Sequence, residues 1–263
     1  MLTEAAEQIV LREVGKRYET ASGAVAAVEA VSFTVRNREF VTLLGPSGCG
    51  KSTLLGIIGG LVRPGTGRVL IDGEPVVGPN PRKVALVFQD AGLFPWRTAL
   101  DNVGFGLELQ GVAAGRRREI ALGLLEPMGL RGFEAKYPRE LSGGMRQRVA
   151  IARALALETP ILLMDEPFGA LDEQTRLLMG EWLVGIRGRT PKTIVFVTHS
   201  LQEAIALSDR IVVMTARPGR VKDVIDVSVP YPRDLNAAVV ADLRAKLWDQ
   251  VREESLKAMG GRL

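Results

Sequence analysis

The sequence predicts an α/β fold with a mostly parallel sheet, and three observations lead to this prediction. Short apolar runs, most of them rich in β-branched residues, alternate with segments of helical periodicity, at residues 40–44, 84–88, 161–164, 193–198 and 211–214. A glycine-rich stretch directly follows the first run and precedes a helical segment. Three of the other runs end in polar or charged residues, which is typical of strand ends that contact a ligand in α/β sheets.

The composition is that of a globular protein with a mixed surface. A chain of 263 residues is long enough for one large α/β domain with subdomains. No apolar run approaches the roughly 20 residues that span a bilayer, and the acidic N-terminus does not resemble a secretory signal. The single cysteine excludes an internal disulfide and agrees with a reducing, cytoplasmic compartment. The net charge of +4 is scattered, which favours a solvated surface over nucleic-acid binding.

The glycine-rich stretch has the form G-x-x-x-x-G-K-[ST] of a phosphate-binding loop, or P-loop. It reads Gly45-Pro46-Ser47-Gly48-Cys49-Gly50-Lys51-Ser52-Thr53. Glycines let the backbone wrap around phosphate oxygens, and the following helix directs its positive end at the same place. We expect Lys51 to reach the β- and γ-phosphates of a nucleotide and Ser52 to bind magnesium. The alternative is a glycine-rich surface turn.

The N-terminal segment predicts an antiparallel edge sheet. Residues 9–14 and 28–35 have the composition or alternation of strands, and a loop is expected between them. Tyr18, which lies between these strands and just before the loop, has two interpretations that stay open: a hydrophobic anchor, or a flat ring that stacks on a purine. Residues 66–77 predict a hairpin around Asp72-Gly73.

The middle of the chain predicts a helical insertion over residues 91–136, with helices at 98–110 and 116–128. The apolar loop Phe94-Pro95-Trp96 precedes these helices and either covers the core or is a docking surface. Leu141-Ser142-Gly143-Gly144 then leads into a helix that Ser142 is suited to cap. On its own this is a generic helix start, but beside a P-loop it suggests a second anion-binding site.

Polar residues at the ends of strands are the candidate catalytic groups. Gln89 follows one apolar run, Asp165 and Glu166 follow a second, and His199, the only histidine, follows a third. Adjacent carboxylates allow one to hold hydrated magnesium and the other to orient or deprotonate the attacking water. An imidazole at the same edge is suited to bond the γ-phosphate and that water. The alternatives are ordinary turn residues and a structural histidine.

The C-terminal segment, residues 234–262, predicts an amphipathic helix that packs on the body of the protein or on a partner. Its apolar residues recur at intervals of four, at Leu235, Val239, Leu243, Leu247 and Val251.

The order and separation of these motifs, together with Ala170-Leu171-Asp172, resemble the ATP-binding cassette (ABC) ATPases of membrane transporters over residues 8–225. The resemblance implies two ATP molecules held between two subunits. It implies that Tyr18 stacks on adenine, Gln89 binds magnesium and water, Glu166 is the general base and His199 senses the γ-phosphate. It also implies that Ser142, Gly143 and Gly144 contact the opposite ATP, and that Asp172 lies at the subunit interface.

Residues 87–98, 141–148 with Met145, and 217–220 further resemble the nitrate, sulfonate and taurine importer ATPases. Met145 departs from the wider ABC family, in which glutamine is commoner at this position. This likeness implies ATP hydrolysis coupled to uptake of a small anionic or zwitterionic solute. The implied partners are a second nucleotide-binding subunit, a membrane permease and, indirectly, a solute-binding protein. Alternatives are a soluble ABC ATPase that acts on nucleic acid or ribosomes, and a small-molecule kinase.

The resemblance also implies a single nucleotide-binding domain with four parts. A RecA-like core with its β subdomain is expected over residues 1–90 and 156–225, a helical subdomain over 91–155, and a C-terminal helical extension over 226–263.

Overall fold

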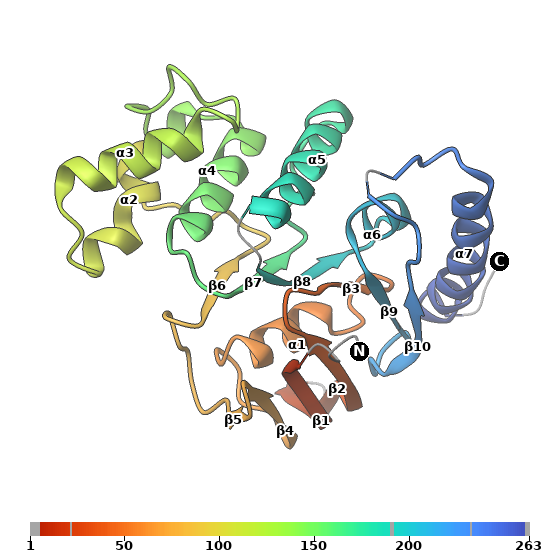
Figure 1. Ribbon diagram of the computed structural model, residues 1–263. Helices are drawn as coiled ribbons and strands as arrows, with labels where there is room; N and C mark the ends of the chain where they lie inside the picture. The colour runs from red at the N-terminus through yellow and green to blue at the C-terminus, as the bar shows by residue number, and fades with distance from the viewer. Residues whose placement is uncertain (1–5, 22, 190–191, 232, 261–263) are drawn as a thin grey trace. The chain divides into compact units, whose positions relative to one another are not determined.

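The computed structural model describes residues 6–21, 23–189, 192–231 and 233–260. The chain forms two compact units, one of residues 1–80 with 190–263 and the other of residues 81–189 (Figure 1). Each unit is described below by itself. The predicted division into core, β subdomain, helical subdomain and C-terminal extension stays a prediction.

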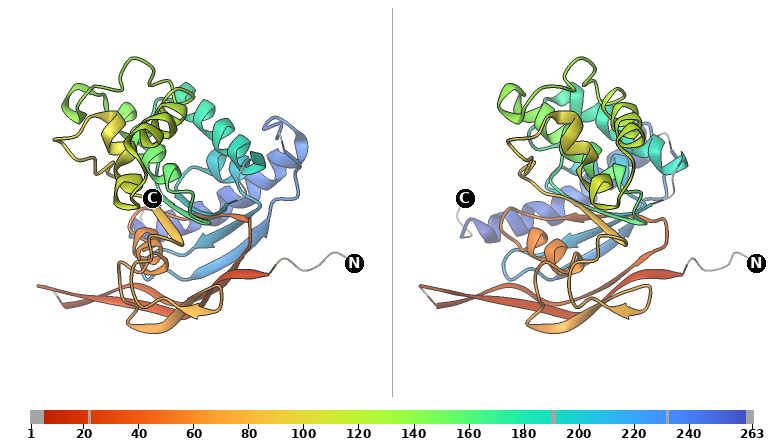
Figure 2. Two further views of the ribbon diagram at one scale, coloured as in Figure 1. Left: turned by 60° about the vertical axis from the view of Figure 1, so that its left-hand side comes forward. Right: turned by 90° about the vertical axis from the view of Figure 1, so that its left-hand side faces the viewer.

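The first unit contains an antiparallel sheet of four strands in the order β2-β1-β4-β5. Figure 2 shows β1 (Glu7–Thr20) and β2 (Gly23–Arg36) as a long paired ribbon with β4 (Thr66–Ile71) beside it. Both strands extend well beyond the predicted 9–14 and 28–35, so the loop expected between them was wrong. The ladder continues to the pair Thr20↔Gly23, because backbone pairing outweighs the weak strand propensity of its small residues.

The hairpin predicted around Asp72-Gly73 is confirmed, with a shorter second strand. Asp72 and Gly73 have φ of 52° and 80°, the left-handed values that a type I′ turn requires. The second strand, β5, is only Glu74–Pro75. A proline at that place lacks the N–H that would extend the ladder.

The first unit also contains strands of a mixed sheet in the order β10-β9-β3-β8. β3 (Phe40–Leu44) pairs in parallel with β8 (Thr193–Thr198) and with β9 (Arg210–Met214), and β10 (Val221–Asp226) pairs antiparallel with β9. Every residue of β3, β8 and β9 is buried, as their continuous apolar runs predict. Their carboxyl ends share one edge, from which α1 (Lys51–Ile58) and α6 (Leu201–Leu207) continue.

The C-terminal helix, α7 (Ala238–Ala258), packs on this sheet, which confirms the predicted amphipathic helix. The apolar residues that α7 buries differ from the predicted ones. Val240 and Leu247 are fully buried, whereas Val239 is 58% exposed and Leu235 precedes the helix. Four-residue steps advance 40° beyond a full turn each, so residues at a strict interval of four cannot all share one face.

The second unit holds a parallel strand pair and most of the helices. β6 (Val84–Val87) pairs with β7 (Ile161–Asp165), and the helices are α2 (Ala99–Leu109), α3 (Ala114–Leu125), α4 (Gly143–Ala156) and α5 (Glu173–Arg189), with a 3₁₀ turn at Pro138–Glu140. The helix predicted at 98–110 is confirmed as α2, with Thr98 as its N-cap. α3 ends earlier than the predicted Met128, just before Pro127. Among the described residues, no helix is long and apolar enough to cross a bilayer.

Candidate active site

The P-loop connects β3 to α1, and its glycines have the conformations that the motif predicts. Gly48 and Gly50 have φ of 74° and 99°. A Cβ atom on Gly50 would lie 2.6 Å from the carbonyl oxygen of Ala27, so a side chain at this position would displace the neighbouring strand. The loop therefore leads directly into the first turn of α1, whose unpaired N–H groups favour an anion.

The Lys51 side chain is buried inside the loop. Its ammonium donates hydrogen bonds to the carbonyl oxygens of Gly45 at 2.8 Å and Pro46 at 3.0 Å. Ser52, the next residue, is exposed at the start of α1. A fixed positive charge, a helix N-terminus and an exposed hydroxyl lie together, and this donor set fits the phosphates of a nucleotide.

A second segment touches the P-loop, a contact that was not predicted from the sequence. A Cβ atom on Gly219 would lie only 2.0 Å from the carbonyl oxygen of Cys49, so the two backbones are in direct contact. Arg217 Nε donates to the carbonyl oxygen of Gly48 at 3.2 Å. No local pattern signals this contact, because Gly219 follows a strand that pairs with β3 only in the folded sheet.

Tyr18 and His199 both belong to the first unit. Tyr18 lies in β1, which extends beyond the predicted strand; its side chain is 40% exposed, and the Lys16 ammonium is 5.4 Å from the ring centroid. His199 directly follows β8 and is exposed. Because β8 is parallel to β3, with Thr198 opposite Leu44, His199 and the start of the P-loop lie at the same edge of the sheet.

The candidate carboxylates follow β7 in the second unit. Asp165 ends the strand and is 9% exposed. Glu166 has φ of 42°, a left-handed value that is uncommon for a non-glycine residue and that recurs at functional sites. Val87 pairs with Met164 across the parallel strands, so Gln89 and Glu166 each lie two residues beyond that pair. The structure thus brings these three polar side chains to one edge of the second unit.

The Ser-Gly-Gly segment begins α4 as predicted. Ser142 Oγ accepts a hydrogen bond from the Met145 N–H at 3.2 Å. A Cβ atom on Gly144 would lie 3.1 Å from Leu171 Cδ2, so this helix start packs closely against the segment that leads to Asp172. Gly143 and Asp172 are therefore parts of one surface region of the second unit.

Asp172 directly precedes α5 and is hydrogen-bonded to its first turn. Its carboxylate accepts hydrogen bonds from the Thr175 N–H at 2.9 Å and the Thr175 hydroxyl at 2.7 Å. These bonds hold the pKa of Asp172 below its ordinary value. The carboxylate is therefore ionised and fixed in place.

The apolar loop Phe94-Pro95-Trp96 is held in a defined conformation. Trp96 is 71% exposed, while the Phe94 ring packs on Phe105 with centroids 4.4 Å apart. The fully buried Asn102 accepts from the Phe94 N–H at 2.8 Å and donates to the carbonyl oxygens of Phe94, Arg97 and Thr98. The loop therefore presents its tryptophan to solvent from a rigid base.

Helix α4 is also hydrogen-bonded to the segment that precedes this loop. Arg153 donates to the carbonyl oxygens of Ala91 at 2.9 Å and Gly92 at 2.8 Å. Gln147 donates to the carbonyl oxygen of Phe88 at 3.1 Å. The helix that starts at the Ser-Gly-Gly segment thus holds the residues on both sides of Gln89. These roles of Asn102, Gln147 and Arg153 were not predicted, because polar residues within amphipathic helices carry no separate signal in the sequence.

A magnesium site made by protein ligands alone is not present in the described part of the chain, where no three histidine, cysteine or acidic residues are grouped suitably for a metal. Magnesium bound with a nucleotide needs only one or two protein oxygens, because phosphates and water supply the rest. Magnesium prefers hard oxygen donors, and the hydroxyl of Ser52, the carboxylate of Asp165 and the amide oxygen of Gln89 are groups of this type.

Comparisons with known proteins agree with these features. Residues 28–169 match the family model described as "ABC transporter". The chain is 47% identical to the uncharacterized ABC transporter ATP-binding protein MJ0412 of Methanocaldococcus jannaschii, over 96% of this chain and 94% of that protein. It is 43% identical to the aliphatic sulfonates import ATP-binding protein SsuB of Bacillus cereus, over 92% and 95% of the two chains.

Solved structures give the same result for the fold. A dimeric structure of the ATP-binding cassette MJ0796, in a post-hydrolysis state bound to ADP and Pi, matches with a TM-score of 0.78 and 35% identity. The match covers 83% of this chain and 98% of that one. The predicted P-loop fold with its mixed sheet, antiparallel strands and helices is thereby confirmed. This chain belongs to the ABC transporter family, as one of its ATP-binding, ATP-hydrolysing subunits.

Proposed function

We propose that this chain is the ATPase subunit of an importer for a small sulfonate-type solute, the class that includes alkyl sulfonates and taurine. The observation that carries the proposal is its 42–43% identity, over more than nine-tenths of the chain, to several proteins named as aliphatic sulfonates import ATP-binding proteins. Nitrate, whose importers the motifs also resemble, is the competing solute.

The P-loop residues 45–53 form the proposed nucleotide site. The backbone of Gly45–Thr53 holds the phosphates, Lys51 pairs with the β- and γ-phosphates, and the exposed ring of Tyr18 stacks on adenine. The support is the left-handed glycines and the ammonium fixed inside the loop. Magnesium, when bound, neutralises phosphate charge, and we assign Ser52, Asp165 and Gln89 as its protein ligands.

Glu166 is the proposed general base, and its support is the left-handed conformation directly after the buried Asp165. A carboxylate held in this way is suited to accept a proton from the attacking water. His199 is proposed to hydrogen-bond the γ-phosphate, and Gln89 to orient the water. A proton acceptor and two orienting groups are what phosphoryl transfer to water requires of the protein.

Two copies of the chain are proposed to form the working unit. Ser142, Gly143 and Gly144 contact the nucleotide of the opposite subunit through the N-terminus of α4, and Asp172 lies at the interface. The support is that these residues share one surface region, and that the related cassette MJ0796 is described as dimeric. A monomer is then expected to bind ATP and to hydrolyse it poorly.

The Phe94-Pro95-Trp96 loop is the proposed docking surface for a separate membrane permease. The exposed Trp96 on a base fixed by Asn102 supports this assignment, because aromatic anchors on rigid supports are typical of binding surfaces. The proposed location is therefore the cytoplasmic face of the cell membrane, with a solute-binding protein acting through the permease. No nucleic-acid partner is proposed.

The catalytic assignment is tested with Glu166→Gln. Loss of a general base is expected to lower steady-state ATPase activity by about 10²–10⁴-fold and to leave ATP binding intact. Glu181→Gln, at an exposed position of α5, is the matched control and should retain activity. Full activity of Glu166→Gln would remove the general-base assignment.

The solute class is tested with the chain assembled with its permease and solute-binding protein in lipid vesicles that contain ATP. Uptake of a radiolabelled alkyl sulfonate should depend on ATP and be lost with Glu166→Gln. Uptake of nitrate but not sulfonate would move the assignment to the nitrate class. ATPase activity stimulated by nucleic acid or ribosomes, with salt-sensitive binding and no uptake, would favour the soluble alternative.

A further inference from the structure

The buried face of α7 includes a carboxylate. Val240, Leu247 and Glu254 lie seven residues apart on one face, and all three are buried, Glu254 with 2% exposure. Val240 and Leu247 pack on the sheet of the first unit. Removing a carboxylate from water is unfavourable unless it gains charged or hydrogen-bonding partners. The partners of Glu254 therefore indicate what holds the end of this helix.

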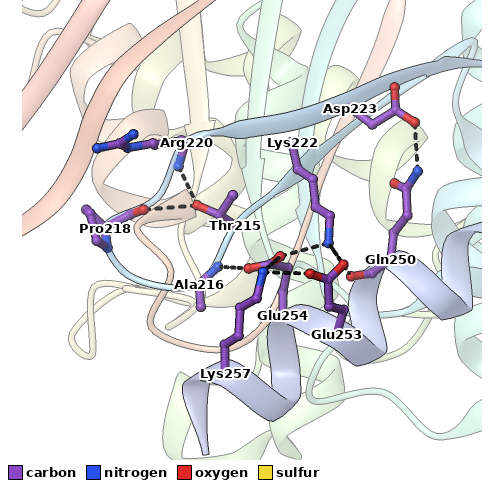
Figure 3. A network of polar contacts seen from close by, with 10 residues as sticks. All are labelled: Thr215, Ala216, Pro218, Arg220, Lys222, Asp223, Gln250, Glu253, Glu254 and Lys257. Carbon is purple, nitrogen blue, oxygen red and sulfur yellow. Dashed lines mark hydrogen bonds and ion pairs between the residues drawn. The ribbon is translucent and has the colours of Figure 1, made fainter. Parts of the chain in front are cut away.

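Glu254 has three partners, shown in Figure 3. Its carboxylate accepts from the Lys222 ammonium at 2.7 Å, the Lys257 ammonium at 2.9 Å and the Ala216 N–H at 2.9 Å. Burial alone would raise the pKa of Glu254, but these bonds outweigh it and lower the pKa to about 2. The carboxylate is thus fully ionised at neutral pH and joins β10, α7 and the segment after β9.

The segment after β9 is a closed turn of residues 215–220. Thr215 Oγ1 donates to the carbonyl oxygen of Pro218 and accepts from the Arg220 N–H, both at 3.0 Å (Figure 3). The Thr215 N–H also donates to the carbonyl oxygen of Arg220 at 2.9 Å. These bonds close the turn on itself and link Ala216 to Gly219 through a short, hydrogen-bonded path. Gly219 is also held by β2, because its N–H donates to the carbonyl oxygen of Ala27 and its carbonyl oxygen accepts from the Glu29 N–H, both at 2.9 Å.

The opposite side of this turn contacts the P-loop at two places. The backbone of Gly219 lies directly against the carbonyl group of Cys49, and Arg217 donates to the carbonyl oxygen of Gly48. Gly48 and Cys49 are in the middle of the phosphate-binding loop. A shift of the turn would therefore change the direction of the loop's N–H groups.

The turn is not packed solidly against the helix. A cavity of about 680 Å³ is lined by Ser47, Gly48, the turn, and Glu254, Lys257 and Ala258 of α7. Since open space separates much of the turn from the helix, the hydrogen bond from Ala216 to Glu254 is a principal contact that fixes the turn from the helix side.

We infer that Glu254 is a positioning residue for ATP: through Ala216 and the turn 215–220, it holds the P-loop in the conformation that binds phosphate. This inference rests on the proposed nucleotide site. α7 then contributes to nucleotide affinity as well as to the core. Because Glu254 acts on the P-loop through the turn, its effect is expected on ATP binding and not on the hydrolysis step.

The test compares Glu254→Ala, Glu254→Gln and Glu253→Gln by calorimetric titration with ATP and magnesium. Glu253 is the neighbouring acid, binds the same two lysines and is 56% exposed, but within the described part of the chain the bond from Ala216 goes to Glu254 and not to Glu253. We expect Glu254→Ala to weaken ATP binding by about three- to tenfold, the size typical of residues that couple distant sites. Glu254→Gln keeps an acceptor for the Ala216 N–H and should recover most of that loss. Glu253→Gln should bind like the unmodified chain.

Two further variants separate positioning from folding. Leu247→Ala removes apolar contacts of the same helix and should lower the melting temperature without changing the affinity of the folded fraction for ATP. Arg217→Ala, at an exposed position of the turn, should raise KM for ATP and leave kcat nearly unchanged.

The inference is overturned if Glu254→Ala or Arg217→Ala binds ATP as tightly as the unmodified chain, or if Leu247→Ala weakens binding as much as Glu254→Ala. Lys51→Ala tests the nucleotide site separately, because unchanged binding there would show that the P-loop is not the site.

Discussion

The base of the Phe94-Pro95-Trp96 loop allows a prediction that can be worked out from four hydrogen bonds. Asn102 is fully buried in α2. Its amide oxygen accepts from the Phe94 N–H at 2.8 Å, and its amide nitrogen donates to the carbonyl oxygens of Phe94, Arg97 and Thr98 at 3.0–3.2 Å. The perturbation is the pair Asn102→Ala and Asn102→Asp. Asn102→Ala removes all four bonds, whereas Asn102→Asp keeps the acceptor and removes the donated bonds.

Asn102→Ala leaves the Phe94 N–H without its acceptor, and an unsatisfied buried donor costs about 1–3 kcal/mol. With the loss of the three donated bonds, we expect the free energy of unfolding to fall by about 3 kcal/mol. Asn102→Asp keeps the acceptor but directs a second carboxylate oxygen at three carbonyl oxygens. A buried charge without donors is costlier, so we expect a loss of about 3–5 kcal/mol at pH 7.

The assay is urea unfolding followed by circular dichroism at pH 7 and pH 5. The carboxyl introduced by Asn102→Asp should have a raised pKa, so its penalty should shrink as the pH falls and the group takes up a proton. Glu108→Gln is the control, because it removes the 2.7 Å ion pair with Arg97 on the exposed side of the same loop. That pair should contribute less than about 1 kcal/mol. If Asn102→Asp is as stable as the unmodified chain at pH 7, the donated bonds of Asn102 do not stabilise the loop as described.

Three further predictions follow from named contacts. Trp96→Ala should leave ATP binding unchanged and reduce ATP-driven uptake with the permease, because its 71% exposed ring is the proposed anchor; undiminished uptake would count against the docking surface. Gly219→Ala should weaken ATP binding at least tenfold, since a Cβ atom there would lie 2.0 Å from the Cys49 oxygen; titration calorimetry measures it. The pKa of Glu254 is lowered from 4.5 to about 2, so about 3 kcal/mol of stability is present above pH 4.5 and is lost as the pH falls toward 2. The difference in unfolding free energy between the unmodified chain and Glu254→Gln should shrink over that pH range.

Much of the fold was predictable, because local patterns and tertiary structure agree in it. The apolar runs at 40–44, 161–164 and 193–198 form buried strands. Thr98 is the N-cap of α2 and Ser142 is the N-cap of α4. Strand lengths were predictable only in part. β1 and β2 continue through small and charged residues, since each is paired with the other over that length. Pairing is a property of two segments, and neither segment shows it alone.

The candidate site, like the fold, was predictable only in part. Motifs in the sequence predicted the P-loop and four polar residues of the site, Gln89, Asp165, Glu166 and His199. The structure places each of them at the carboxyl end of a strand or within two residues beyond it. Their roles stay proposals. The supporting contacts could not be predicted, because they join backbone carbonyls to polar side chains far away in the sequence. Every residue has such a carbonyl, so the sequence does not indicate which of them accepts a hydrogen bond from a distant side chain.

The sequence by itself determined the family, the fold class and the positions of the phosphate-binding loop and the candidate catalytic groups. It did so because a P-loop needs glycine at fixed positions and buried strands need continuous apolar runs. Only the tertiary structure decided that Gly219 and Arg217 touch the P-loop and that Glu254 holds their turn from a helix 38 residues away from Ala216. The physical reason is that a buried carboxylate must find donors, and which donors it finds depends on how the sheet brings chain segments together.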